Sequence, residues 1–214
     1  MATLDRSYVK ESLRQLAAGR TKTFGAVEHK FLLNPPVAEA DLVAFELKHH
    51  IHLPADYRHF LREIGNGGAG SFYGIFPLGT MDGLGGKLEA WAERDDFVGI
   101  LAQPFPLTEA WNDLSGMPSA ELIDTNEEEY GRQLQVFERK YFDSSYVNGA
   151  IPICHEGCAL RVWLVVTGQQ AGHLWLDDRA NDMGIKPVLL TDGSRATFSF
   201  WYAEWLEGAL RELR

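Results

Sequence analysis

One stretch of the chain, residues 53–78, constrains the fold more than any other, because it places a helix, a glycine turn and a strand in a defined order. Pro54 stands at the expected first helical position, and Asp56 follows in the first turn, where a carboxylate opposes the helix dipole. The turn, GNGG at residues 65–68, is rich in glycines that accept positive φ, and the aromatic segment 72–78 predicts a strand. Apolar side chains recur on one face of the expected helix, at Leu53, Tyr57, Phe60, Leu61 and Ile64.

The order of these elements excludes a dinucleotide site. Gly65, Gly67 and Gly70 have the G-x-G-x-x-G spacing of a dinucleotide-binding loop. That loop needs a strand before the glycines and a helix after them, so that the helix N-terminus faces the pyrophosphate. Here the helix comes first, and a structural turn is the better interpretation.

The same stretch resembles the SUKH superfamily, through LP-x-D-Y-R-x-F-L, an N-G-G-x-G turn and Y-G-I-F-P-L. Residues 149–178 and 198–206 are also similar to the pattern of that family, so the resemblance spans most of residues 36–210. Between residues 81 and 148 only positions 104–113 match. The residues that form the structural signature are Leu53, Pro54, Tyr57, Phe60, Leu61, Asn66, Gly67, Gly68, Gly70, Tyr73, Gly74 and Pro77.

The resemblance implies a binding protein. The superfamily includes many bacterial immunity proteins, which neutralise secreted or contact-delivered toxins that are often nucleases, and a fungal regulator of cell-wall synthesis. It implies a non-enzymatic function without a cofactor. Neutralisation of a cognate toxin by stoichiometric occlusion is the leading expectation, and an intracellular scaffold or regulatory adaptor is the alternative.

Composition predicts one soluble domain over residues 1–214. A chain of 214 residues that is 45% hydrophobic has enough apolar material for one sizeable core. Its aromatic content of 12% argues against disorder. The N-terminus is charged, and no window approaches the roughly 20 apolar residues that a membrane span needs. We therefore expect a cytoplasmic protein with no membrane partner.

The net charge of −10 restricts the partners further. Proteins that bind nucleic acid or anionic membranes rely on clustered Lys and Arg, which this chain does not offer. An acidic surface favours a protein partner with a basic surface, such as a toxin that grips phosphate groups. Charge of this size also serves solubility, so it is compatible with the immunity role without establishing it.

The pattern elsewhere predicts an α+β fold, with a mixed or mainly antiparallel sheet and helices packed on it. Helical periodicity is expected from Leu4 to a stop at Gly19 and over residues 37–48, 88–94 and 127–141. Alternation over 160–166, a turn at 168–172 and a second strand at 173–177 predict a hairpin. A closing helix carries Trp201, Trp205, Leu206, Ala209 and Leu213 on one stripe.

Three motifs that suggest metal or phosphate chemistry are incomplete. Cys154 and Cys158 are the first and last residues of the segment CHEGC. A structural zinc site needs four ligands in paired short spacings, and this chain has only two cysteines. We therefore expect two reduced thiols on either side of a turn at residues 156–157. The histidines at 49, 50 and 52 suit the end of a helix. The loop at 83–87 lacks both ends of the phosphate-binding pattern, because Met81 and Leu88 stand at the diagnostic positions.

No catalytic nucleophile stands out, since the chain has no G-x-S-x-G elbow. Paired carboxylates at 95–96, 127–129 and 177–178 are expected to be solvated. A hydrolase that uses His155, Glu156 and Asp177 remains the alternative from another functional class. We expect a partner-binding surface at Trp175, Asp177 and Asp178, where acidic side chains follow an aromatic that is expected to be exposed.

Overall fold

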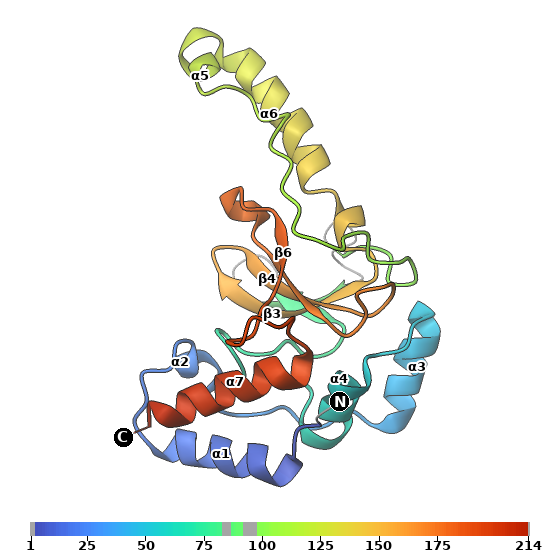
Figure 1. The fold of residues 1–214 in the computed structure, drawn as a ribbon, viewed down its shortest axis with the longest axis vertical. Helices are drawn as coiled ribbons and strands as arrows, with labels where there is room; N and C mark the ends of the chain where they lie inside the picture. The colour runs from blue at the N-terminus through green and yellow to red at the C-terminus, as the bar shows by residue number, and fades with distance from the viewer. Residues whose placement is uncertain (1–2, 83–86, 92–97, 214) are drawn as a thin grey trace.

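The computed structural model describes residues 3–82, 87–91 and 98–213. In Figure 1 a sheet occupies the centre, helices pack beneath it, and a pair of helices extends from the opposite end. The longer helices are α1 (Arg6–Ala18), α3 (Glu39–His49), α6 (Glu127–Tyr141) and α7 (Phe198–Arg211), and the shorter ones are α2 (Ala26–His29), α4 (Ala55–His59) and α5 (Glu121–Thr125). A π-helical turn, η1 (Phe60–Ile64), continues α4, and 3-10 turns form η4 (Ser144–Val147) and η5 (Arg179–Asn181).

The described strands form two antiparallel sheets. Strands β1 (Thr80–Asp82) and β2 (Leu88–Ala90) pair with each other. The main sheet has the order β3 (Ala150–Gly157), β4 (Leu160–Val165), β5 (Leu174–Asp177) and β6 (Ile185–Pro187). Trp163 lies opposite Trp175 in the β4–β5 hairpin. The expected α+β class and the expected hairpin are both confirmed.

Side chains cover both faces of the main sheet. Alternation along β4 sends Val162 and Leu164 into a core shared with α1, α4 and α7. Trp163 and Val165 point to the other face, where they join a second core with Phe105 and neighbouring residues. Because this second face is also buried, the aromatic residues of β4 and β5 are not exposed to solvent.

The signature helix packs as its sequence predicts. All five side chains of the predicted apolar face are at most 5% exposed. Pro54 precedes α4 as its N-cap and is not its first helical residue, which corrects the sequence expectation by one position. The chain then leaves η1 through Gly65 in an extended conformation, and the positive φ angles follow at Gly67 (75°) and Gly68 (99°).

A buried carboxylate joins the signature helix to the closing helix. Asp56 Oδ2 accepts a hydrogen bond from the Ser199 backbone N–H at 3.0 Å, in the first turn of α7. The Thr197 side chain at the N-cap makes no such bond, so Asp56 supplies the acceptor from 143 residues away. Tyr202 on α7 donates to the Ala69 carbonyl at 3.0 Å, which holds the glycine turn against the same helix.

The other expected helices are confirmed: α1 ends at Gly19, α3 covers residues 39–49, α6 covers residues 127–141, and α7 buries the stripe of Trp201, Leu206 and Ala209. Within the described residues no helix combines the length and the apolar content that crossing a bilayer requires.

Three local predictions are wrong. Residues 72–78 form no continuous strand, because Ile75 makes only isolated bridges to Gly68 and Cys154. Residues 88–90 are strand β2 and not helix, since they pair with β1, while residues 92–94 of that expected helix lie outside the described part. The turn in CHEGC falls at Cys158 and Ala159, with φ angles of 48° and 65°, because β3 continues to Gly157.

The Asp56 bridge predicts a specific stability loss. Asp56→Ala leaves the first turn of α7 without its acceptor in a buried setting, which lowers the free energy of unfolding by about 1–3 kcal/mol. Asp56→Asn keeps one acceptor oxygen and loses less. Chemical denaturation measures both, with the exposed Asp124→Ala on α5 as the control. Equal stability of Asp56→Ala and the control would contradict the bridge.

Candidate functional site

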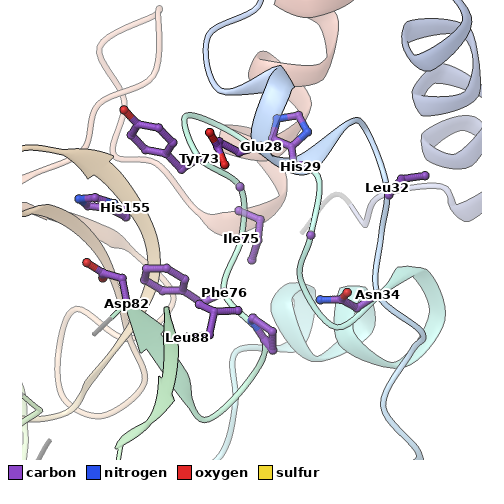
Figure 2. Close-up of a pocket in the computed structure, with 13 residues that line it drawn as sticks. Glu28, His29, Leu32, Asn34, Tyr73, Ile75, Phe76, Asp82, Leu88 and His155 are labelled. Atoms are coloured by element: carbon purple, nitrogen blue, oxygen red, sulfur yellow. The ribbon is translucent and has the colours of Figure 1, made fainter. Parts of the chain in front are cut away.

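The signature turn forms one wall of a cleft of about 580 Å³, which we call the signature cleft. It lies between the loop that carries α2, the segment 68–77 and the end of β3, and it is defined by Glu28, Tyr73, Gly74, Phe76, Asp82 and His155 among its lining residues. Figure 2 shows Tyr73, His155 and Asp82 along one side of this space, with Glu28 and His29 at its edge. Of the signature residues, Gly68, Tyr73, Gly74 and Pro77 line the cleft.

Backbone contacts that only glycine permits shape the cleft wall. Gly68 and Ile75 exchange two N–H···O bonds, each of 2.8 Å. Gly74 has a φ of 100°, and a Cβ there would lie 2.5 Å from the Gly68 carbonyl oxygen. A Cβ on Gly68 would meet the Leu32 carbonyl oxygen at 2.4 Å. The glycines are therefore required for the close approach of three chain segments.

Tyr73 and His155 form a stacked pair at the mouth of the cleft. Their ring centroids are 5.3 Å apart and the rings are inclined by 24°. Tyr73 is 41% exposed, so one part of its ring remains available to a ligand. Burial lowers the pKa of His155, the Arg161 charge lowers it further, and Asp82 partly opposes both. The two rings together present a flat surface, and burial favours the neutral form of the imidazole.

An ion pair fixes Asp82, one of the side chains that line the cleft. Asp82 on β1 accepts from Arg161 Nε at 3.0 Å and from Arg161 Nη2 at 2.6 Å, and both side chains are nearly buried. The bidentate geometry ties the small sheet to β4. Arg161 also lines a second hollow, of about 810 Å³, which continues to Phe142 and Arg179 at the end of α6. The pair therefore lies between the signature cleft and the foot of α6.

The expected partner surface at the end of β5 is instead internal. Trp175 is fully buried, with its ring 4.9 Å from that of Phe105, so the expectation of an exposed aromatic is wrong. Asp177 pairs with Arg179 at 2.6 Å, and Asp178 pairs with Lys186 at 3.1 Å. Trp175 is buried because it belongs to the second core, which covers the face of the sheet that we expected to be exposed to solvent.

The Asp177 pair has a structural role at the foot of α6. Arg179, only 5% exposed, donates to the Tyr141 carbonyl at 3.0 Å and to the Asp143 carbonyl at 3.2 Å. These are carbonyls at the C-terminal end of α6, where a helix leaves acceptors unpaired and favours a cation. Asp177 orients the guanidinium that holds α6 to the sheet.

The metal and thiol candidates are dispersed. Cys154 is buried, donates to the Ser71 carbonyl at 3.2 Å and has a pKa raised by burial, whereas Cys158 is exposed on the turn. His49 and His50 lie at the end of α3. In the part of the chain that the structure describes, no three His, Cys, Asp or Glu side chains gather to hold a metal ion. Residues 83–86 of the rejected phosphate loop, and Asp95 and Asp96, lie outside that part.

The groups of the hydrolase alternative have separate surroundings. His155 lines the signature cleft, while Asp177 is engaged by Arg179. Burial raises the pKa of Glu156 to about 7, the Asp178 charge adds to the rise, and Lys186 opposes it. Such a pKa suits an acid or a base, yet the described contacts give Glu156 no nucleophile to activate.

Sequence reasoning missed Glu28, Asp82 and Arg161. These residues come from α2, β1 and β4, and no spacing in the sequence connects them. Only the bridges that bring segments 32–34, 68–75 and 153–155 together place them near one another.

The α+β fold is consistent with the SUKH resemblance of the sequence. The model of the SMI1 / KNR4 family (SUKH-1) matches residues 36–182, which is more than half of the chain. The protein therefore belongs to the SMI1 / KNR4 (SUKH-1) family. That family is generally non-enzymatic, and its membership indicates protein–protein interaction. Comparison with curated proteins gave no match, and comparison with solved structures gave none either.

The raised pKa of Glu156 predicts a pH-dependent stability. A folded pKa of about 7 above an unfolded value of 4.5 means that stability from this group is present below pH 4.5 and is lost as the pH rises through 7. Glu156→Gln should therefore match the wild type in acid and exceed it by about 1 kcal/mol above pH 8, a value reduced for partial exposure. Denaturation across the pH range measures this.

The control for the pH series is Glu127→Gln, which makes the same substitution at an exposed position on α6. A constant offset for Glu156→Gln at every pH would show that Glu156 ionises in the folded protein as it does in the unfolded chain.

Proposed function

We propose that this protein is an immunity-type binding module that neutralises a toxin with a basic surface by covering it stoichiometrically. The family supports protein binding, and the observation that carries the finer proposal is an acidic helical projection, which we call the acidic arm. It comprises residues 119–136, which include α5 and most of α6. Figure 1 shows it extending away from the sheet.

The acidic arm is solvated throughout. None of its residues is buried, and Ile123 and Val136 are 48% and 58% exposed. The arm contains five carboxylates, at positions 121, 124, 127, 128 and 129, and one cation, Arg132. Its formal charge is therefore −4, out of −10 for the whole chain. Glu129 pairs with Arg132, and the glutamates at 127–129 stand in the first turn of α6, where carboxylates oppose the helix dipole. A projection that combines acidic and exposed apolar side chains is suited to contact with another protein.

The mechanism is occlusion without turnover. A toxin that grips phosphate carries clustered Lys and Arg, and its field attracts an acidic projection and accelerates association. The arm enters or covers the basic groove while the body of the protein blocks the approach of substrate. The Arg179 contacts to the carbonyls of Tyr141 and Asp143 hold the arm in position against the sheet. No cofactor takes part.

Capture of the tagged protein from lysate of its source organism, at moderate salt and with mass-spectrometric identification, tests this proposal. One basic, toxin-like polypeptide should dominate the bound material. A set of envelope-synthesis proteins without a toxin would replace immunity with the scaffold function. Neutralisation by occlusion needs no catalytic acid or base, so Glu156→Gln should neutralise the toxin as well as the wild type does. Loss of neutralisation by a folded Glu156→Gln variant would favour the hydrolase.

Charge reversal on the arm should slow association with the captured partner. Glu127→Lys/Glu128→Lys lowers the association rate by about tenfold at low salt, and the deficit shrinks as salt screens the charges. Surface plasmon resonance over a salt series measures the rates. The matched control is Glu11→Lys/Glu207→Lys, which makes the same charge change on α1 and α7. An equal effect of both double variants would show that net charge matters and the arm does not.

A further inference from the structure

An unusual set of exposed apolar side chains surrounds the signature cleft. Phe24 is 59% exposed, Val27 80%, Leu32 64% and Tyr73 41%. They come from the loop around α2 and from the signature turn, and Leu32 and Tyr73 line the cleft itself. Contiguous exposed apolar side chains beside a hollow mark a protein-contact surface more often than a solvent-facing one.

This aromatic rim is held in place before any partner arrives. Phe24 and Tyr73 meet edge to face with centroids 5.3 Å apart. Gly25 brings the Phe24 loop so close to the signature turn that a Cβ would lie 1.6 Å from the Phe72 carbonyl oxygen. Thr23, at the start of this loop, bonds to Glu212 near the end of the chain. A preorganised rim loses little conformational entropy on binding.

The charges at the cleft select the ligand. Asp82 is paired with Arg161, and burial lowers the pKa of His155, so Glu28 supplies the unpaired carboxylate among the lining residues. Glu28 is exposed and has no ion-pair partner among the described residues. Glu28 and Tyr73 both line the cleft, and Figure 2 shows the two side chains there together with His155. A carboxylate and an aromatic ring in one cleft match the planar guanidinium of arginine, which stacks on rings and donates to carboxylate oxygens.

We propose that the signature cleft is an anchor site for one arginine side chain on the surface of the protein partner. The guanidinium stacks on Tyr73 and pairs with Glu28, while apolar residues of the partner contact the rim formed by Phe24 and Val27. The proposal rests on the protein-binding function proposed above and names the feature of the partner that this site recognises. It does not depend on the acidic arm.

The test uses acetyl-arginine amide as the probe and acetyl-citrulline amide, which is nearly isosteric and neutral, as its control. Both are titrated at constant ionic strength into isotope-labelled protein and followed by NMR. The arginine probe should shift the Tyr73 and His155 ring signals and the amides of residues 74–76, with an affinity about fivefold above that of citrulline. Glu28→Gln and Tyr73→Leu should each remove most of this difference, whereas Glu11→Gln, at an exposed position on α1, should leave it unchanged.

Shifts spread over the acidic surface without change at the cleft, equal binding of the two probes, or no binding at all would each overturn the proposal. Should Tyr73→Leu fail to fold, the wild-type shift map and Glu28→Gln still decide the result. A negative NMR titration would overturn the arginine site without changing the result of the toxin capture. A capture without a toxin would overturn the immunity proposal without changing the NMR result.

Discussion

The bond from Ser199 to the buried Asp56 carboxylate is the contact on which the arrangement of the rest depends. It joins the signature helix to the closing helix, and those two elements together hold the glycine turn, through Tyr202 and Ala69. With the turn in place, Gly68 and Ile75 pair and the next residues reach the edge of β3, where Phe76 donates to the Ile153 carbonyl at 2.9 Å. The signature cleft is the space that this sequence of contacts leaves open.

The Asp82–Arg161 pair connects that cleft to the other end of the molecule. Asp82 lines the cleft and Arg161 lines the second hollow, so one nearly buried ion pair lies between the signature cleft and the foot of α6. Arg179 has the equivalent role at the foot of α6, where it joins the sheet to the helix. Both arginines are nearly buried and are used to hold elements of the fold together.

Helices and strands with a hydrophobic pattern that extends over many residues could be predicted from the sequence. The candidate site could not. Helix 127–141 and the β4–β5 hairpin follow from patterns that depend only on neighbouring residues. The alternation over residues 160–166 identified two faces of the hairpin but not the Phe105 segment that covers one of them, so Trp175 was wrongly expected to be exposed. Asp82 meets Arg161, and Glu28 lines the same cleft as Asp82, through contacts between segments far apart in the chain, which leave no local pattern in the sequence.

The measurement that tests the account most directly is a titration of the captured toxin with this protein while the activity of the toxin is followed. Occlusion predicts that activity falls in proportion to the protein added and reaches zero at one equivalent. The recovered toxin should have an unchanged mass and regain its activity once the complex is separated. Complete inactivation by a small fraction of an equivalent, or a covalent change in the toxin, would show turnover and contradict the binding function.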